Sequence, residues 1–227
     1  MKFITPDWPA PKHIKAYTTT RVGFGELPLP QNEAILNELL KLPTNPIWLT
    51  QKHTAICVEA TPNNQRQIAD ASFTIDKNRV CAVLTADCLP ILMTDRQGSS
   101  VAAIHAGWRG LQSGIIEATV KSLSIDPTEL LVWLGPAISP QKFEVGEEVF
   151  TAFVSQHAAS ESAFKPLGNH KWLANLYHLA QIRLKLLNIT ACYGGDFCTY
   201  TQDDLFFSYR RDKGQTGRLV SLIWIES

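Results

Sequence analysis

The sequence predicts an α/β protein built on mixed β-sheets. Apolar segments with strand character alternate with segments in which apolar residues recur at helical spacing. Several strand segments follow one another directly, without a helix between them. This order favours a mixed sheet, or two sheets with helices outside, over a doubly wound parallel sheet. No linker or internal repeat divides the 227 residues, so we expect one domain over residues 1–227.

The first third of the chain is expected to hold one helix among short strands. A strand over residues 14–21 is followed by Gly23 and Gly25, which predict its end. Apolar residues at helical spacing predict a helix over residues 32–41. Further strand-like segments occupy residues 46–51, 55–60 and 70–74.

The rest of the chain supplies the buried strands and the longer helices. Three runs rich in Val, Ile and Leu predict buried strands, at residues 80–86, 90–94 and 100–105. Apolar residues on one helical face predict helices at residues 110–123, 144–157 and 172–187. Shorter strands are expected at residues 131–134, 190–195 and 219–225.

Charge and cysteine content limit the classes of partner and compartment. The 21 Lys and Arg residues balance 21 Asp and Glu residues, which argues against a nucleic-acid or membrane-surface partner. No apolar run is long enough to cross a bilayer, and we expect no secretory signal, because the first residues lack a continuous apolar region. Five cysteines without framework spacing fit the reducing cytoplasm.

Reactive side chains follow the predicted strands at the points where these strands end. Cys88 and His105 end two apolar runs, and His53 follows a third strand-like segment. Imidazole and thiolate are zinc ligands, and three ligands from separate strand ends suit a site with an open fourth position. The alternative is structural: Cys88 is a small buried hydrophobe, and each histidine donates to a carbonyl.

The same side chains also support nucleophilic catalysis. Cys88 would then be the nucleophile, with His105 or His53 as its base. The residues do not choose between this role and metal ligation, because surroundings that lower a thiol pKa also suit a metal. The neighbouring Asp87 offers a carboxylate for proton transfer, or it caps backbone N–H groups of a turn.

A glycine-rich turn after the strand at 100–105 is a candidate anion site. Gly107, Trp108, Arg109 and Gly110 connect this strand to the predicted helix. Backbone N–H groups at a helix N-terminus favour an anion such as phosphate, and Arg109 would complete the site. Arg21 and Arg210, both in polar turns, are further candidates, although each residue type is more often a surface ion-pair partner.

Four motifs together resemble the YfiH family, also described as laccase-domain, polyphenol oxidase-like or peptidoglycan-editing proteins. In chain order they are Thr85-Ala86-Asp87-Cys88-Leu89-Pro90, His105-Ala106-Gly107-Trp108-Arg109-Gly110, Leu134-Gly135-Pro136-Ala137-Ile138 and Phe206-Phe207-Ser208-Tyr209-Arg210-Arg211-Asp212. The resemblance runs from Trp8 to Trp224. It implies a single domain with layered sheets, which we expect as an α/β/β/α sandwich.

The resemblance also implies an activity and a cofactor. It implies zinc held by His53, Cys88 and His105, phosphorolysis of adenosine, inosine, guanosine and methylthioadenosine, and deamination of adenosine. Asp87, Cys88 and Arg109 are then the expected catalytic residues, and phosphate and nucleoside the small-molecule partners. Two alternatives are a cysteine-dependent amidase that edits the cell-wall precursor UDP-MurNAc-L-Ser, and a metal-binding interaction protein without turnover.

The laccase name and one departure from the family bear on the expected metal and substrates. Multicopper oxidases hold four coppers with many histidines, often as His-x-His pairs, whereas this chain has six histidines and no such pair. We therefore expect one metal, with copper as a possible occupant because copper generally binds more tightly than zinc. The segment from Arg21 to Trp48 is also shorter than in most of the family, which puts the substrate range in question.

Overall fold

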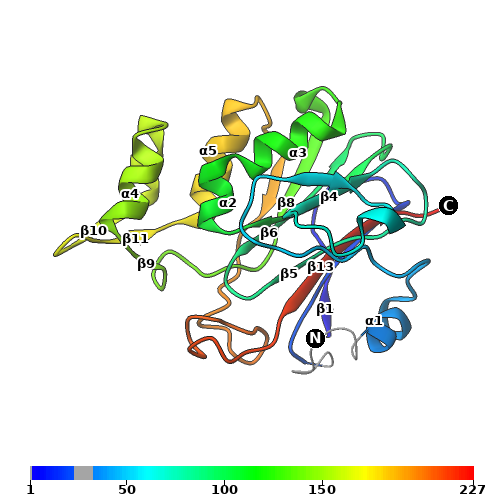
Figure 1. The fold of residues 1–227 in the computed structure, drawn as a ribbon, viewed down its shortest axis with the longest axis horizontal. Coiled ribbons are helices and arrows are strands. Elements are labelled where there is room, and N and C mark those ends of the chain that lie inside the picture. The colour runs from blue at the N-terminus through cyan, green and yellow to red at the C-terminus, as the bar shows by residue number, and fades with distance from the viewer. Residues whose placement is uncertain (1, 23–32) are drawn as a thin grey trace.

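Two β-sheets packed face to face form the centre of the molecule (Figure 1), a computed structural model that describes residues 2–22 and 33–227. The larger sheet has the strand order β12-β8-β6-β7-β4-β3 and contains both parallel and antiparallel neighbours. Its strands are β3 (Cys57–Glu59), β4 (Ala71–Thr74), β6 (Leu89–Asp95), β7 (Val101–Ala106), β8 (Leu130–Leu134) and β12 (Cys192–Gly194).

The smaller of the two sheets has the order β1-β2-β13-β5. Its strands are β1 (Phe3–Ile4), β2 (Ile14–Thr19), β5 (Cys81–Thr85) and β13 (Leu219–Ile225). The last strand of the chain, β13, pairs antiparallel with both β2 and β5 and so joins the two ends of the sequence.

Alternating side chains of these strands build three apolar layers. Ile91 and Met93 of β6 face a cluster formed with the helices, whereas Leu92 between them packs against the smaller sheet. On β13, Ile223 faces the core between the sheets and Trp224 faces outward. Both faces of these strands are covered. This explains why their sequences are uninterrupted apolar runs rather than alternating apolar and polar residues.

Helices cover the two outer faces, which confirms the predicted α/β/β/α layering. The larger sheet is covered by α2 (Trp108–Ser113), α3 (Ile115–Leu123) and α5 (Leu176–Leu186), whose apolar residues share one core with that sheet. The smaller sheet is covered by α1 (Glu33–Leu40), which buries Leu36 and Leu40 against it. No helix of residues 2–22 and 33–227 has the length and apolar character of a transmembrane span.

Two predicted helices begin too early because their first residues join a third sheet. The segments expected at 144–157 and 172–187 start as β9 (Glu144–Gly146) and β11 (Lys171–Ala174), and continue as α4 (Glu147–Val154) and α5. With β10 (Phe164–Gly168), these strands form a small antiparallel sheet in the order β10-β11-β9. Phe150 of α4 stacks on Trp172 of β11, with ring centroids 3.8 Å apart.

Two further predictions need correction. The helix expected at 110–123 begins at Trp108 and is divided into α2 and α3 by Gly114, whose φ of 92° lies in the left-handed region. The segment 46–51 is no regular strand, since its pairing in the described structure consists of isolated bridges at Ile47 and Thr50. Gly23 and Gly25 lie outside the described residues, and β2 ends before them at Thr19.

Candidate metal centre and cleft

Strand pairing brings His53, Cys88 and His105 together at one end of the strands of the larger sheet. Leu89, which opens β6, pairs with Ala106 at the end of β7, so Cys88 and His105 are diagonal neighbours on the same face of the two strands. The loop that carries His53 runs directly into β3, which pairs with β4, the neighbour of β7. The expected convergence of three distant residues is therefore found in the structure.

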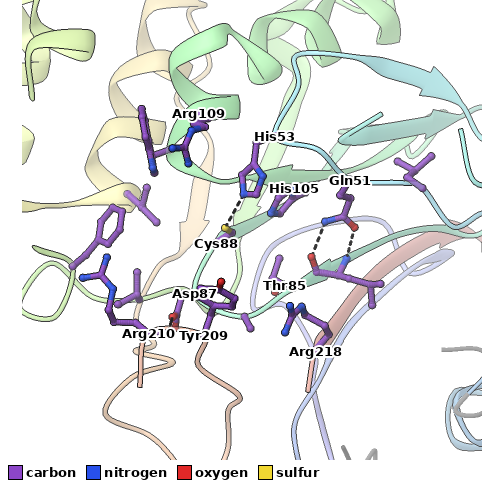
Figure 2. Close-up of a pocket in the computed structure, with 17 residues that line it drawn as sticks. Gln51, His53, Thr85, Asp87, Cys88, His105, Arg109, Tyr209, Arg210 and Arg218 are labelled. Atoms are coloured by element: carbon purple, nitrogen blue, oxygen red, sulfur yellow. Dashed lines mark hydrogen bonds between the residues drawn. The ribbon is translucent and has the colours of Figure 1, made fainter. Parts of the chain in front are cut away.

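The three side chains direct their ligand atoms toward a common point. One ligand atom from each residue lies within 4.8 Å of the other two. Cys88 Sγ is 3.7 Å from His53 Nε2 (Figure 2), and the two imidazole rings meet edge to face at 4.8 Å between centroids. Among the residues that the structure describes, this is the single group of three or more His, Cys, Asp and Glu side chains with metal-binding spacing.

Asp70, a fully buried residue, orients both histidines. Its Oδ1 lies 2.7 Å from His105 Nδ1, which leaves Nε2 of that ring for the centre of the site. The same carboxylate accepts hydrogen bonds from the backbone N–H groups of His53, at 3.0 Å, and Thr54, at 2.6 Å. This holds the loop in place although His53 adopts a φ of 60°. A carboxylate behind a metal-ligating histidine is a recurrent feature of zinc sites.

The protonation of the cluster is shifted by mutual interaction. Burial would raise the pKa of Cys88, but hydrogen bonds and charge from His105 and His53 outweigh it and lower the pKa to about 6. Burial would likewise lower the pKa of His105, yet its bonds to Asp70 and Cys88 raise the pKa to about 9. Without a metal, the site therefore favours a thiolate beside an imidazolium.

Gly107 is required beside this cluster because a side chain would collide with it. A Cβ atom at this position would lie 2.6 Å from His53 Cδ2 and 3.0 Å from Cys88 Sγ. The glycine also follows the last residue of β7 and forms the N-cap of α2. The motif His105-Ala106-Gly107 thus combines a ligand with the space that the other two ligands need.

The donor set fits a metal ion. Two imidazole nitrogens and one thiolate sulfur are the ligand types of zinc and copper sites in proteins. Three protein ligands, rather than four, are typical of sites that leave one position for water or substrate. The buried Asp70 behind His105 adds the second interaction that such a site needs to fix its ligand.

A cleft of about 660 Å³ opens over the cluster (Figure 2). It is lined by the three candidate ligands, by Asp87, Trp108, Arg109 and Arg210 from the predicted set, and by apolar residues that include Ile138, Phe143 and Leu176. Its volume lies in the range of small-molecule sites. The structure therefore gathers most of the predicted site residues in one place.

The cleft wall is positively charged. Arg109 lies over the ring of Trp108 at 4.4 Å, and Arg210 donates from Nη1 to the carbonyl oxygen of Glu144 at 3.0 Å. Neither guanidinium forms an ion pair with a carboxylate in the described part of the chain. A third arginine, Arg218, also lines the cleft. Such a wall suits an anionic ligand.

Asp87 is the carboxylate of the cleft lining, and its oxygens are heavily used. They accept hydrogen bonds from Thr199 Oγ1 at 2.6 Å, Ser208 Oγ at 3.1 Å and Arg210 N at 2.7 Å. Asp87 therefore fastens the 199–210 segment against the end of β5, and one of its three donors is a backbone N–H. Its role in proton transfer stays a prediction.

Arg21 and Gly110 lie apart from the cleft lining. Arg21 donates from Nη1 to the carbonyl oxygen of Asp203 at 2.7 Å and lies over Phe207 at 5.2 Å. Gly110 is buried in α2, where a Cβ atom would lie 3.3 Å from the carbonyl oxygen of Thr54. Their roles in binding phosphate or substrate stay predictions.

Sequence reasoning did not assign several residues of the cleft. Gln51, Thr85, Tyr209 and Arg218 line it without having been given a role. Thr85 and Tyr209 stand inside motifs that carry the family resemblance, so the motifs contained a signal for them. For Arg218, which precedes a predicted strand with no motif around it, the sequence offers no comparable signal.

Comparisons with known proteins find relatives over nearly the whole chain. The family model described as multi-copper polyphenol oxidoreductase laccase matches residues 25–226. A purine nucleoside phosphorylase of Pseudomonas aeruginosa is 46% identical over 242 aligned positions, which cover 99% of this chain and 98% of the relative. The Escherichia coli protein named purine nucleoside phosphorylase YfiH is 43% identical and covers 99% of both chains.

Solved structures show the same fold. A Neisseria meningitidis protein superposes with a TM-score of 0.93 at 41% sequence identity and covers 100% of both chains. YlmD from Geobacillus stearothermophilus superposes with a TM-score of 0.86 at 24% identity, which supports the fold alone. By full-length relatives, matched family model and shared fold, this chain belongs to the YfiH family of laccase-like domain proteins.

Proposed function

We propose that this protein is a purine nucleoside phosphorylase that works with a single metal ion. One observation carries the proposal: the His53–Cys88–His105 cluster lies in a cleft whose arginines have no carboxylate partner among the described residues. A nucleoside and inorganic phosphate are the substrates that match both the name given to the relatives and this charge.

We place zinc, with copper as the alternative metal, on His53, Cys88 and His105. The ligand types and the support from Asp70 favour this assignment. A zinc ion bound there would act as a Lewis acid toward an oxygen atom of a bound ligand. The protein holds the three ligand side chains at the ends of paired strands. A site supported by regular strands keeps its geometry more precisely than one built on loops alone.

Phosphate binding falls to the arginines of the cleft in this proposal. Arg109 and Arg210 bind the anion, with the backbone at Gly107 and Trp108 beside it. A phosphate oxygen forms a bond to ribose C1′, the bond from C1′ to the base nitrogen breaks, and the base leaves with the electron pair and takes up a proton. The expected substrates are adenosine, inosine, guanosine and methylthioadenosine.

Deamination of adenosine is a second proposed reaction of the same cleft. Water adds at C6 of the purine, ammonia leaves, and inosine is the product. Asp87 is the proposed proton carrier, because it is the carboxylate of the cleft lining and still has lone-pair capacity beyond its three accepted bonds.

One contact favours a different chemistry. The 3.7 Å distance from Cys88 Sγ to His53 Nε2 is that of a thiol–imidazole pair, as a cysteine-dependent amidase acting on UDP-MurNAc-L-Ser would need. A covalent adduct trapped on Cys88 during turnover would support this reaction. A metal-binding protein without turnover would instead contain metal and yield no product from either substrate.

The decisive experiment measures metal content and nucleoside products together. Purified protein is assayed for zinc and copper and incubated with adenosine, with and without phosphate. We expect one metal per chain, adenine and ribose 1-phosphate that depend on phosphate, and inosine that does not.

A pair of matched variants completes the test. His105→Ala should lose metal and both products, whereas His178→Ala, in α5 and hydrogen-bonded to Ser162, should keep them. Metal-loaded wild-type protein that forms no product at high concentration would reject the phosphorylase proposal. Activity that survives in a metal-free His105→Ala variant would reject the metal's part in it.

A further inference from the structure

Tyr209 is an exposed aromatic residue in the wall of the cleft. It is 56% exposed, whereas the other large apolar residues exposed in the described part of the chain are Val, Ile and Leu. Tyr209 lines the cleft together with the three candidate ligands. Because ligand sites are lined largely by apolar and aromatic side chains, an uncovered ring at this position offers a contact surface to a bound molecule.

The backbone on both sides of Tyr209 is anchored next to the candidate metal centre. Ser208 Oγ and Arg210 N, which flank Tyr209 in the chain, both donate to Asp87 Oδ2, at 3.1 Å and 2.7 Å. Asp87 directly precedes Cys88, so one strand end carries both a candidate ligand and the anchor of this turn. The position of Tyr209 is therefore fixed relative to the three candidate ligands.

Arg211 holds the same segment together from within. Residues 195–218, between β12 and β13, contain no helix or strand, so their carbonyl groups need other donors. Arg211 donates from Nη1 to the carbonyl oxygen of Thr199 at 2.8 Å and from Nη2 to that of Phe206 at 2.9 Å. Its Nε and Nη2 also bond to the carboxylate of Asp212, at 2.8 Å and 3.1 Å. A segment fixed in this way loses little conformational freedom when a ligand binds to it.

The ring of Tyr209 is supported by the chain but not covered by it. A Cβ atom at Gly214 would lie 3.4 Å from Cε2, Cζ and Oη of the tyrosine, so the backbone there supports the hydroxyl end of the ring. In Figure 2, Tyr209 lies between Arg210 and Arg218. The guanidinium carbon of Arg218 is 5.9 Å from the ring centroid, farther than the about 3.5–4.0 Å between carbon atoms in contact.

We propose that Tyr209 stacks on the purine base of the bound nucleoside. This inference rests on the proposed function and adds the residue that recognises the base. Every base has an aromatic face, so stacking accepts adenine, hypoxanthine and guanine alike, as an enzyme for several purine nucleosides needs. Arg210, which binds phosphate in the proposed function, is the next residue in the chain. The two substrates would thus be held side by side, so that both can meet at ribose C1′.

The test compares Tyr209→Leu, which keeps an apolar side chain, with Tyr209→Phe, which keeps the ring. Steady-state kinetics of the metal-loaded protein are measured with inosine and adenosine at varied phosphate. We expect Tyr209→Leu to raise the KM for both nucleosides about five- to hundredfold and to leave the KM for phosphate unchanged, whereas Tyr209→Phe should retain most of the nucleoside affinity. Tyr17→Leu is the control, because this tyrosine of β2 packs on the outer face of the smaller sheet and should leave the nucleoside KM unchanged.

Two further measurements separate the base from the ribose and binding from damage to the fold. Calorimetry with hypoxanthine and with ribose 1-phosphate should show that Tyr209→Leu weakens binding of the base and leaves binding of the sugar phosphate unchanged. The melting temperature and metal content of Tyr209→Leu should stay close to those of the wild type, because the residue is exposed and is not one of the candidate ligands.

A wild-type nucleoside KM in Tyr209→Leu would overturn the inference and leave the proposed function intact. So would an equal loss in Tyr209→Phe, which would assign the effect to the hydroxyl group, or a loss of affinity for ribose 1-phosphate instead of hypoxanthine. If the wild type binds hypoxanthine more tightly than Tyr209→Leu does but turns nothing over, the proposed function fails and the role of Tyr209 stands. Wild-type protein that neither binds nor converts nucleosides would overturn both.

Discussion

The Asp70 carboxylate lies 2.7 Å from Nδ1 of His105 and joins the two histidines of the candidate metal centre. Its other bonds reach the loop of His53, including the backbone N–H of His53 itself. Asp70 precedes β4 directly, and His105 N donates to its carbonyl oxygen at 2.7 Å. One buried residue thus sets the orientation of one ligand and the loop conformation of another.

Asp70→Asn should weaken metal binding about ten- to hundredfold, because the charged partner of His105 is lost. Competition with a chelator measures the affinity. The matched control is Asp95→Asn, a buried aspartate that caps its own turn through the N–H groups of Ser99 and Ser100. Equal metal affinity in Asp70→Asn and wild type would show that the contact between Asp70 and His105 does not contribute to metal binding.

The strands were predictable because burial leaves a local signature. The apolar runs at 80–86, 90–94 and 100–105 correspond to β5, β6 and β7, and each of their ends is shifted by one residue. Both faces of these strands are covered, so their sequences contain few polar residues. The polar residues at the strand ends, Cys88 and His105, stood out for the same reason.

Features that depend on distant pairing were not predictable. Residues 144–146 and 171–174 continue helical patterns, yet they pair with each other as β9 and β11. The sequence places Asp70 in a predicted strand, and nothing near it in the sequence reveals the histidine that it contacts. The cleft position of Arg218 likewise depends on how β13 pairs with β5.

A bound metal should protect Cys88 from alkylation. In metal-loaded protein, iodoacetamide at pH 7 should leave Cys88 unmodified, and removal of the metal should make it react ahead of Cys57, Cys81 and Cys192. Burial raises the pKa of Cys57, Cys81 and Cys192, so these thiols should react slowly in both forms. Peptide mass spectrometry locates the adduct. Equal modification of Cys88 with and without metal would argue against its role as a ligand.

Arg109→Ala should raise the KM for phosphate at least about tenfold, since a hydrogen bond to a charged group is lost. The nucleoside KM should change little, because in the proposed function Arg109 binds the anion. Steady-state kinetics with each substrate varied in turn measure both values. Arg96→Ala, which removes an exposed arginine near Glu129, serves as the control. A change confined to the nucleoside KM would show that Arg109 does not bind the phosphate.

The helical layer depends on a buried arginine, and Arg183→Ala should destabilise the fold by about 3–5 kcal/mol. Arg183 is 5% exposed and bonds to Glu117 Oε1 at 3.0 Å and Gln156 Oε1 at 2.6 Å, which links α5 to α3 and to the end of α4. Urea unfolding gives the change in free energy. Arg96→Ala is again the control, and it should lower the free energy of unfolding by less than about 1 kcal/mol.

Gly107→Ala should remove metal binding while the protein remains folded. The added methyl group would lie 2.6 Å from the His53 ring and 3.0 Å from Cys88 Sγ, so at least one ligand must leave its position. The φ of Gly107 is −66°, so alanine introduces no backbone strain and the loss would be local to the cluster.

Two measurements test this prediction: the metal content of the protein after gel filtration, and its circular dichroism spectrum, which reports whether it is folded. Gly168→Ala is the control, because its φ of 84° strains alanine while the space around it is open. That variant should lose some stability and keep its metal, the reverse of Gly107→Ala. A Gly107→Ala protein with a full complement of metal would contradict this prediction and show that the ligands can make room for the methyl group without losing the ion.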